Sequence, residues 1–170
     1  MLRRIFGSGN VPEKSTPPAN PEAQLKSWME QLAKELNTKF EDRGNGLFKI
    51  DVPLKYPDGT WRYQMVWGRI QKAYTKDKRD VFYFQSRSGE IGRGVDIFAL
   101  LREGTLGIYS MLSVITESRT DGTPCEMVYV QASPVVDWTT SYDIVKFIIT
   151  EVASVGDFLE KKYFGGTDTH

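Results

Sequence analysis

The stretch GLFKIDVPLKYPDGTWRYQMVWGRI, residues 46–70, decides the predicted fold, because it has the pattern of two strands joined by a tight turn. Its first half alternates apolar and polar residues, as a half-buried strand does. YPDG, residues 56–59, is a type I turn signal. A four-residue loop at YPDG would pair Lys55 with Thr60 and oppose only apolar residues on one face. Those opposed pairs are Leu54 with Trp61, Val52 with Tyr63, Ile50 with Met65, and Phe48 with Trp67.

The second half of this stretch interleaves aromatic residues with Arg62 and Arg69, a composition that also suits a nucleic-acid platform. The predicted register places the aromatic and arginine side chains on neighbouring faces, where they do not form one stacking surface. Lys plus Arg and Asp plus Glu each number 22, so the formal net charge is zero and gives no bulk attraction to nucleic acid. We therefore expect the tryptophans in the core and no nucleic-acid partner.

The segments on either side of this hairpin predict two long helices, a short one and three further strands. NPEAQLKSWMEQLAKEL, residues 20–36, carries Asn20 as an N-cap and an apolar stripe at helical spacing. The last helix is predicted to begin at Thr140 or Ser141 and to end at Gly165. The pattern between them predicts strands at residues 80–86, 107–118 and 125–132 and a short helix at residues 95–103.

The predicted order is α-β-β-β-α-β-β-α, an α+β fold with an antiparallel sheet and its long helices on one face. Residues 1–19 are rich in Pro, Ser, Gly and Asn and are expected to form a disordered tail. Residues 20–166 then form a single domain, followed by a short C-terminal tail at 167–170. The chain has a single cysteine and no run approaching the roughly 18 apolar residues of a spanning helix. These features predict a cytoplasmic protein without membrane contact.

The three later strands carry apolar residues on both faces, unlike the first two, which have one polar face. Two helices on one side of the sheet would leave the other apolar side uncovered, and a second subunit or a client protein would supply the cover. We therefore expect a protein client or a homodimer as the partner. The candidate partner-binding residues are Val81, Tyr83, Tyr109, Met111 and Tyr129.

The sequence contains no set of residues that indicates catalysis. The only histidine is His170, the last residue, which leaves no preorganised base for Ser-His or Cys-His catalysis. Cys125 follows Pro124 in an apolar strand and is interpreted as a small core residue. We expect no catalytic residues, no metal and no cofactor.

A glycine-rich segment, SGEIGRG at residues 88–94, offers the alternative of a small-ligand or phosphate site between a strand and a helix. The segment matches neither G-x-G-x-x-G nor G-x-x-x-x-G-K-[ST], and a loop needing positive φ is the other interpretation. The candidate ligand-binding residues are Arg87, Ser88, Gly89, Gly92, Arg93 and Gly94.

Four segments in this order carry a resemblance to a known family: DGTWRYQMVW, FYFQSRSGEIG, DIFALLREG and EVASVGDFLEKKYFGGTD. Over about residues 22–168 the chain resembles the YbjN-like proteins, bacterial domains that share the fold of type III secretion chaperones. LLRE looks like a helix pattern of that family in which an Asn commonly follows the Arg, where this chain has Glu103. EVASVGDFLE is similar to the family's closing helix, where a small residue and an Asp precede a Leu-Glu pair.

The resemblance implies a non-enzymatic, protein-binding domain that is often dimeric. Secretion chaperones hold an unfolded segment of a secreted client against apolar patches, and YbjN-like proteins are usually described as regulators. The residues and the resemblance together predict a chaperone-like or regulatory protein-binding module that acts as a homodimer. The small-ligand site at residues 88–94 stays as the alternative.

Overall fold

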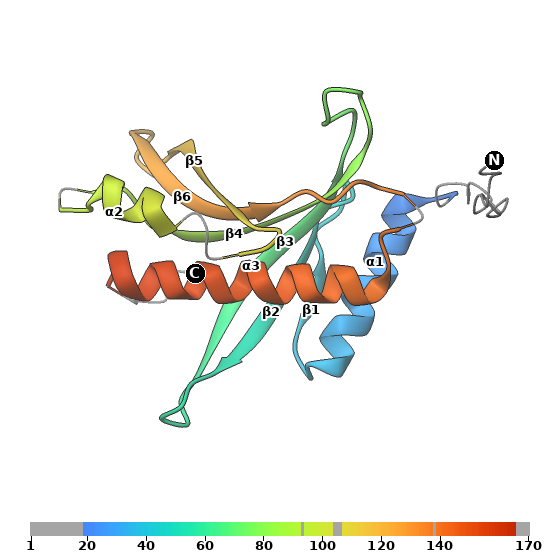
Figure 1. The fold of residues 1–170 in the computed structure, drawn as a ribbon, viewed down its shortest axis with the longest axis horizontal. Helices are drawn as coiled ribbons and strands as arrows, with labels where there is room; N and C mark the ends of the chain where they lie inside the picture. Colours follow the sequence, from blue (N-terminus) through green and yellow to red (C-terminus); the bar gives the residue numbers. More distant parts are fainter. Residues whose placement is uncertain (1–18, 93, 104–106, 138, 166–170) are drawn as a thin grey trace, which may run out of the picture.

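The computed structural model describes residues 19–92, 94–103, 107–137 and 139–165. In this part of the chain, six strands form one antiparallel sheet in the order β1-β2-β3-β4-β6-β5 (Figure 1). The elements are α1 (Pro21–Glu35), β1 (Phe40–Asp42), β2 (Phe48–Lys55), β3 (Trp61–Gln71), β4 (Val81–Glu90), α2 (Ile97–Arg102), β5 (Met111–Ser118), β6 (Pro124–Ala132) and α3 (Tyr142–Tyr163).

The predicted α+β class and the predicted order of elements are confirmed, with one addition. The additional strand, β1, has three residues and pairs with β2. Three residues are too few for alternation to be recognised in a sequence. The predicted tails fall almost entirely outside the described residues, as does Arg93.

The ends of the long helices are set by the capping residues that the sequence indicated. The Asn20 side chain accepts a hydrogen bond from the Ala23 N–H at 3.0 Å, and a proline occupies the first turn of α1. Ser141, not Thr140, caps α3 and accepts from the Ile144 N–H at 3.4 Å. Gly165, with φ +81°, follows the last turn of α3. Each cap satisfies backbone groups that a helix end leaves unpaired.

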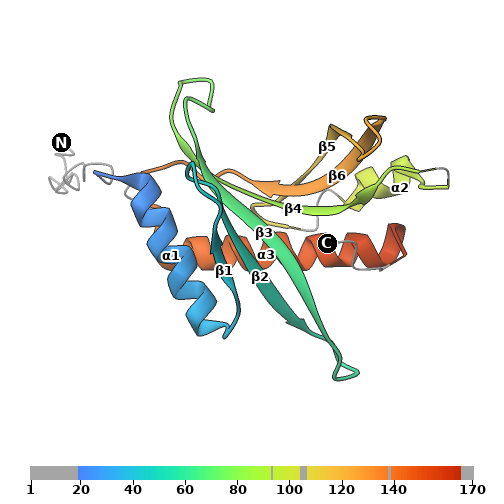
Figure 2. The same ribbon diagram turned by 180° about the vertical axis from the view of Figure 1, so that it is seen from behind.

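Helices α1 and α3 pack on the same face of the sheet and share one core with it. Leu25, Met29 and Leu32 of α1 are fully buried. From behind, the twisted strands β1, β2 and β3 cross in front of α3, and α1 lies beside them (Figure 2). Close contact with α1 depends on Gly68 in β3, because a Cβ atom there would lie 2.6 Å from the Met29 sulfur. The helices therefore cover one face of the sheet, as predicted.

The register of the β2–β3 hairpin is shifted by one residue from the predicted register. Lys55 pairs with Trp61, not with Thr60. The loop has three residues, with a hydrogen bond from the Tyr56 N–H to the Thr60 carbonyl at 2.9 Å and Gly59 at φ +85°. This is a type I turn followed by a left-handed residue, Gly59, which forms a β-bulge and moves the partner of Lys55 from Thr60 to Trp61. The observed pairs include Leu54 with Arg62, Val52 with Gln64, Ile50 with Val66, and Phe48 with Gly68.

A one-residue shift exchanges the two faces of a strand, so the prediction that the β3 aromatics lie in the core is wrong. Gln64 and Val66 point toward the helices and are fully buried. Trp61 and Tyr63 point away from the helices, and each has 55% of its surface exposed. Met65 and Trp67 are partly buried on that same helix-free face.

Candidate functional site

Exposed apolar side chains gather where α2, β5 and the outer side of α3 meet. Figures 1 and 2 both show α2 and β5 at the same end of the molecule, beside the C-terminal half of α3. Phe98 and Ile108 have 76% and 80% of their surfaces exposed, although both are large and apolar. We call this surface the apolar flank; its members are Ile97, Phe98, Leu101, Ile108, Tyr109, Met111, Val114, Phe147 and Phe158.

Hydrogen bonds to α3 hold the segment that leads into β5 against the helix. The Glu151 carboxylate accepts the backbone N–H groups of Ile108, Tyr109 and Ser110 at 2.8, 2.9 and 2.7 Å. Burial alone raises the pKa of Glu151, but the three N–H groups outweigh it and the pKa lies below its ordinary value of 4.5. The Tyr109 ring packs edge-on against Phe147, with centroids 6.0 Å apart. The apolar flank is therefore attached to α3 and is not a free loop.

The other end of this connection is held by Glu103, the residue at which the chain departs from the family pattern. Its carboxylate pairs with Lys162 and accepts the Tyr163 hydroxyl at 3.0 Å. Its pKa is lowered chiefly by the hydrogen bond from Lys162. Glu103 thus joins the end of α2 to the last turn of α3.

Glu151→Gln is expected to destabilise the chain by about 1 to 2 kcal/mol at pH 7, because the amide lacks the charge that strengthens hydrogen bonds to N–H donors. A carboxyl group with a lowered pKa stabilises the fold above pH 4.5, and this contribution is lost as the pH falls through the folded-state pKa. Urea unfolding of the wild type and of Glu151→Gln should show a difference in unfolding free energy at pH 7 that becomes smaller below pH 4.5. A difference of equal size at both pH values would contradict the stabilising role of the Glu151 charge.

The apolar flank includes an open edge of the sheet. Among the described strands, β5 pairs only with β6, so one side of β5 has no strand beside it. An edge strand presents unpaired backbone N–H and C=O groups to another chain. Val114 lies on the helix side of β5, yet it is 49% exposed because α3 packs mainly over β3, β4 and β6. The strand carries one charged residue, Glu117.

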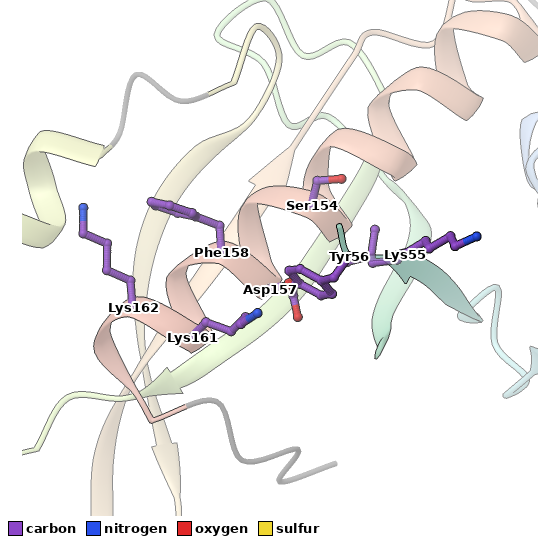
Figure 3. Close-up of a pocket in the computed structure, with 8 residues that line it drawn as sticks. Lys55, Tyr56, Ser154, Asp157, Phe158, Lys161 and Lys162 are labelled. Atoms are coloured by element: carbon purple, nitrogen blue, oxygen red, sulfur yellow. The ribbon is translucent and has the colours of Figure 1, made fainter. Parts of the chain in front are cut away.

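A pocket of about 450 Å³ adjoins the apolar flank, between the β2–β3 turn and the C-terminal half of α3 (Figure 3). Phe158 belongs to both surfaces. The Lys161 ammonium lies 3.5 Å from the centroid of the Tyr56 ring, and Figure 3 shows Phe158 and Lys162 on the opposite side. Asp157 lines the pocket and pairs with Arg62 at 2.8 Å. The pocket has apolar walls and cations at its border.

The predicted partner-binding residues fall into two groups. Tyr109 and Met111 are exposed and belong to the apolar flank. Val81, Tyr83 and Tyr129 lie on the helix-free face and are buried by the chain itself. Their cover comes from irregular segments: the Tyr74 ring packs edge-on against Tyr83, and residue 135 bridges to β4 at Val81. Tyr129 packs in a small second cluster with Cys125 and Met127. These three residues offer little surface to a partner.

The helix-free face carries its own polar and aromatic pocket, of about 460 Å³. The registers place Trp67 beside Gln85 on β4, and Arg87 of β4 beside Tyr129 on β6. The Tyr129 hydroxyl donates to Glu117, and its pKa is raised chiefly by burial. We call this the sheet pocket; it is lined by Leu47, Met65, Trp67, Arg69, Gln85, Arg87 and Tyr129.

The residues of the predicted ligand loop are only partly a loop. Arg87, Ser88 and Gly89 belong to β4, where a bulge separates Arg87 from Gly89. Gly94, in the turn before α2, has φ +105°, as the loop interpretation requires. Arg87, Ser88, Gly89 and Gly92 line a pocket of about 470 Å³, but the carboxylates of Glu90 and Glu160 line it too. Glu90 pairs with Arg119 and Glu160 pairs with Arg62, and the small-ligand site stays a prediction.

No group of three His, Cys, Asp or Glu residues in the described ranges is arranged to hold a metal ion. None of the described helices is long and apolar enough to cross a membrane. Comparison of the chain with family models, with curated proteins and with solved structures finds no match. The resemblance to the YbjN-like family therefore stays a prediction.

Sequence reasoning missed the members of the apolar flank on α2 and α3. A signal was present in the last helix, because Phe147 and Phe158 fall outside the stripe formed by Val145, Ile149 and Val152. Large apolar residues off the buried stripe of a helix indicate either a second core or a binding surface. No comparable signal marks the sheet pocket, since its existence depends on the hairpin register.

Proposed function

We propose that the chain is a protein-binding module, chaperone-like or regulatory, and that the apolar flank is its binding surface. The observation that carries the proposal is the exposure of nine large apolar side chains over neighbouring elements. Exposed apolar surface gathered over neighbouring elements is typical of protein interaction sites. The pocket at Phe158 provides a recess in which one side chain of a partner could be buried, as hot-spot residues commonly are. We place this activity in the cytoplasm, since a single cysteine suits a reducing compartment.

A second copy of the chain is the partner that fits the β5 edge best. Antiparallel pairing of two β5 strands about a twofold axis at Val114 would keep both sets of helices on the same side of a continuous sheet. Val114 would then face its own copy, an apolar pair. Glu117, the one charge on the strand, would face Met111 of the other copy, so no like charges would meet.

The oligomeric state in solution tests this proposal. Size-exclusion chromatography with light scattering should give twice the chain mass for the wild type. Val114→Lys and Phe98→Ser should each raise the dimer dissociation constant by at least about tenfold, as loss of a central interface residue does. Trp61→Ser is the matched control, because Trp61 is also an exposed aromatic but lies outside the apolar flank. A wild type that stays monomeric at all concentrations would contradict self-association.

A further inference from the structure

We propose that the helix-free face of the sheet binds single-stranded nucleic acid, with bases stacked on the β3 aromatics and phosphates held by arginines. This surface is centred on β3, and the proposal does not depend on the function proposed above; of the apolar flank, Met111 of β5 lies on the same face, opposite Gln131. The proposal reverses the expectation drawn from the sequence, which rested on a register that the hairpin does not have.

The β3 aromatics form a row on one face. Trp61, Tyr63 and Trp67 are at odd positions and point away from the helices, and the first two are more than half exposed. Successive same-face residues of a strand are about 6.7 Å apart, so the rings can each meet a different base of an extended strand. Stacking of this kind is tolerant of sequence because every base has a flat face.

Cations border the same row. Arg69 is also at an odd position of β3, so it lies on the aromatic face, whereas Arg62 points to the core. The Arg43 guanidinium lies 5.7 Å from the centroid of the Trp67 ring, and the Lys55 ammonium lies 5.5 Å from that of Trp61. Aromatic and basic side chains thus share one surface, as in proteins that bind single strands, and the Asp51 and Glu41 carboxylates on the same face pair with Lys49.

Two of these cations have no carboxylate partner among the described residues. The Lys55 ammonium lies 5.5 Å from the Trp61 ring centroid and Arg69 lies 5.3 Å from the Tyr83 ring centroid, and neither forms an ion pair with a described residue. Arg43 is 2.5 Å from Glu41, and Arg87 is 3.5 Å from Glu117. Unpaired guanidinium and ammonium groups beside exposed rings are suited to phosphate oxygens.

The sheet pocket gives this surface a place for one base and its phosphate. Trp67 supplies an aromatic wall, and Arg69 and Arg87 supply the positive charge. The Gln85 amide is next to Trp67 and makes no hydrogen bond to another described residue, so its donor and acceptor are available to a base edge. The volume of about 460 Å³ is within the range of small-ligand sites.

An extended peptide fits this face less well. On this face, backbone pairing with a peptide is open only beside residues 61–66, where β3 pairs with β2 alone, because β4 pairs with β3 from Trp67 to Gln71. The side chains of the face are flat rings, cations and an amide, which are complementary to bases and phosphates. We therefore assign the surface to nucleic acid and not to a peptide.

Fluorescence anisotropy with a labelled oligouridylate of about 12 nucleotides, the length that one small sheet domain covers, tests the proposal. Binding should weaken as salt is raised. Arg69→Gln and Tyr63→Ala should each weaken binding by at least about fivefold, and Trp67→Ala by about tenfold. Glu117→Gln should strengthen binding, because it removes the carboxylate beside Arg87. Circular dichroism melting confirms that each variant is folded, and Tyr63→Ala, at an exposed site, keeps the test valid if Trp67→Ala unfolds.

The matched control is Lys34→Gln, which removes an exposed cation on α1. It should not change the affinity. Equal loss in this control and in the β3 variants, or no salt-sensitive binding at all, would overturn the proposal. Binding of free UMP as tight as that of the oligomer would overturn the assignment to a strand. Displacement of the oligomer by an acidic peptide but not by unlabelled oligouridylate would assign the face to peptide.

Discussion

Arg62→Ala is expected to lower the free energy of unfolding by about 3 to 5 kcal/mol, because the side chain holds a buried pair of carboxylates. Arg62 lies on the core side of β3 and reaches two carboxylates of α3. Its Nε atom is 2.8 Å from Asp157 and its terminal nitrogen is 3.0 Å from Glu160. Both acidic residues are 97% buried. Removing the guanidinium would leave two buried like charges close together without this partner.

Urea unfolding monitored by tryptophan fluorescence measures this loss. The control is Arg79→Ala, since Arg79 pairs with Asp77 at the exposed β3–β4 turn and its loss should have little effect. A triple variant, Arg62→Met with Asp157→Asn and Glu160→Gln, should recover part of the lost stability, because no buried charge remains. If Arg62→Ala proves no more harmful than Arg79→Ala, the buried triad does not stabilise the fold in the way described.

This triad explains a motif on which the family resemblance partly rests. VGDFLE, in α3, contains the small residue, the Asp and the Leu-Glu pair. Gly156 packs close to β3 and β4, where a Cβ atom would lie 3.1 Å from the Ser86 hydroxyl. Asp157 and Glu160 bind Arg62, and Leu159 is fully buried. In this chain the motif serves to attach α3 to the sheet.

The elements of the fold could be predicted because their signals are local. The Asn20 and Ser141 caps and the positive-φ glycine after α3 act within one helical turn. The hairpin register could not be derived in the same way. A type I turn at YPDG is compatible with a four-residue loop and with a three-residue loop closed by a bulge at Gly59. The two loops differ by one residue, and that difference decides which face of β3 meets the core.

The candidate surfaces were harder to predict than the fold. The apolar helix-free sides of β4 and β6 indicated an uncovered surface, but the β3–β4 turn and the segment after β6 bury Tyr83 and Val81. Irregular segments have no periodicity from which their final position can be derived. The exposed surface lies instead on α2, the β5 edge and α3. In the sequence, Phe98 and Phe147 are isolated apolar residues and do not form a pattern that marks a surface.

Phe84→Ala is expected to cost about 3 to 5 kcal/mol of unfolding free energy, whereas Trp61→Ala should change it by no more than about 0.5 kcal/mol. Phe84 is fully buried and pairs across the sheet with Gly68 on the helix side. Trp61 projects from the opposite face of the same hairpin beside the Lys55 ammonium. In the register predicted from the sequence, Trp61 lies opposite Leu54 inside the core. In that register Trp61→Ala would be strongly destabilising.

Chemical denaturation of both variants therefore decides between the two registers by a difference of several kcal/mol. Ile50→Ala provides an internal control, because Ile50 faces the core in either register and should lose about 2 to 5 kcal/mol. A loss above about 2 kcal/mol for Trp61→Ala, with Phe84→Ala unchanged in its effect, would show that the hairpin pairs Lys55 with Thr60. The β3 aromatics would then be core residues, and the helix-free face would lose the rings on which nucleic-acid binding depends.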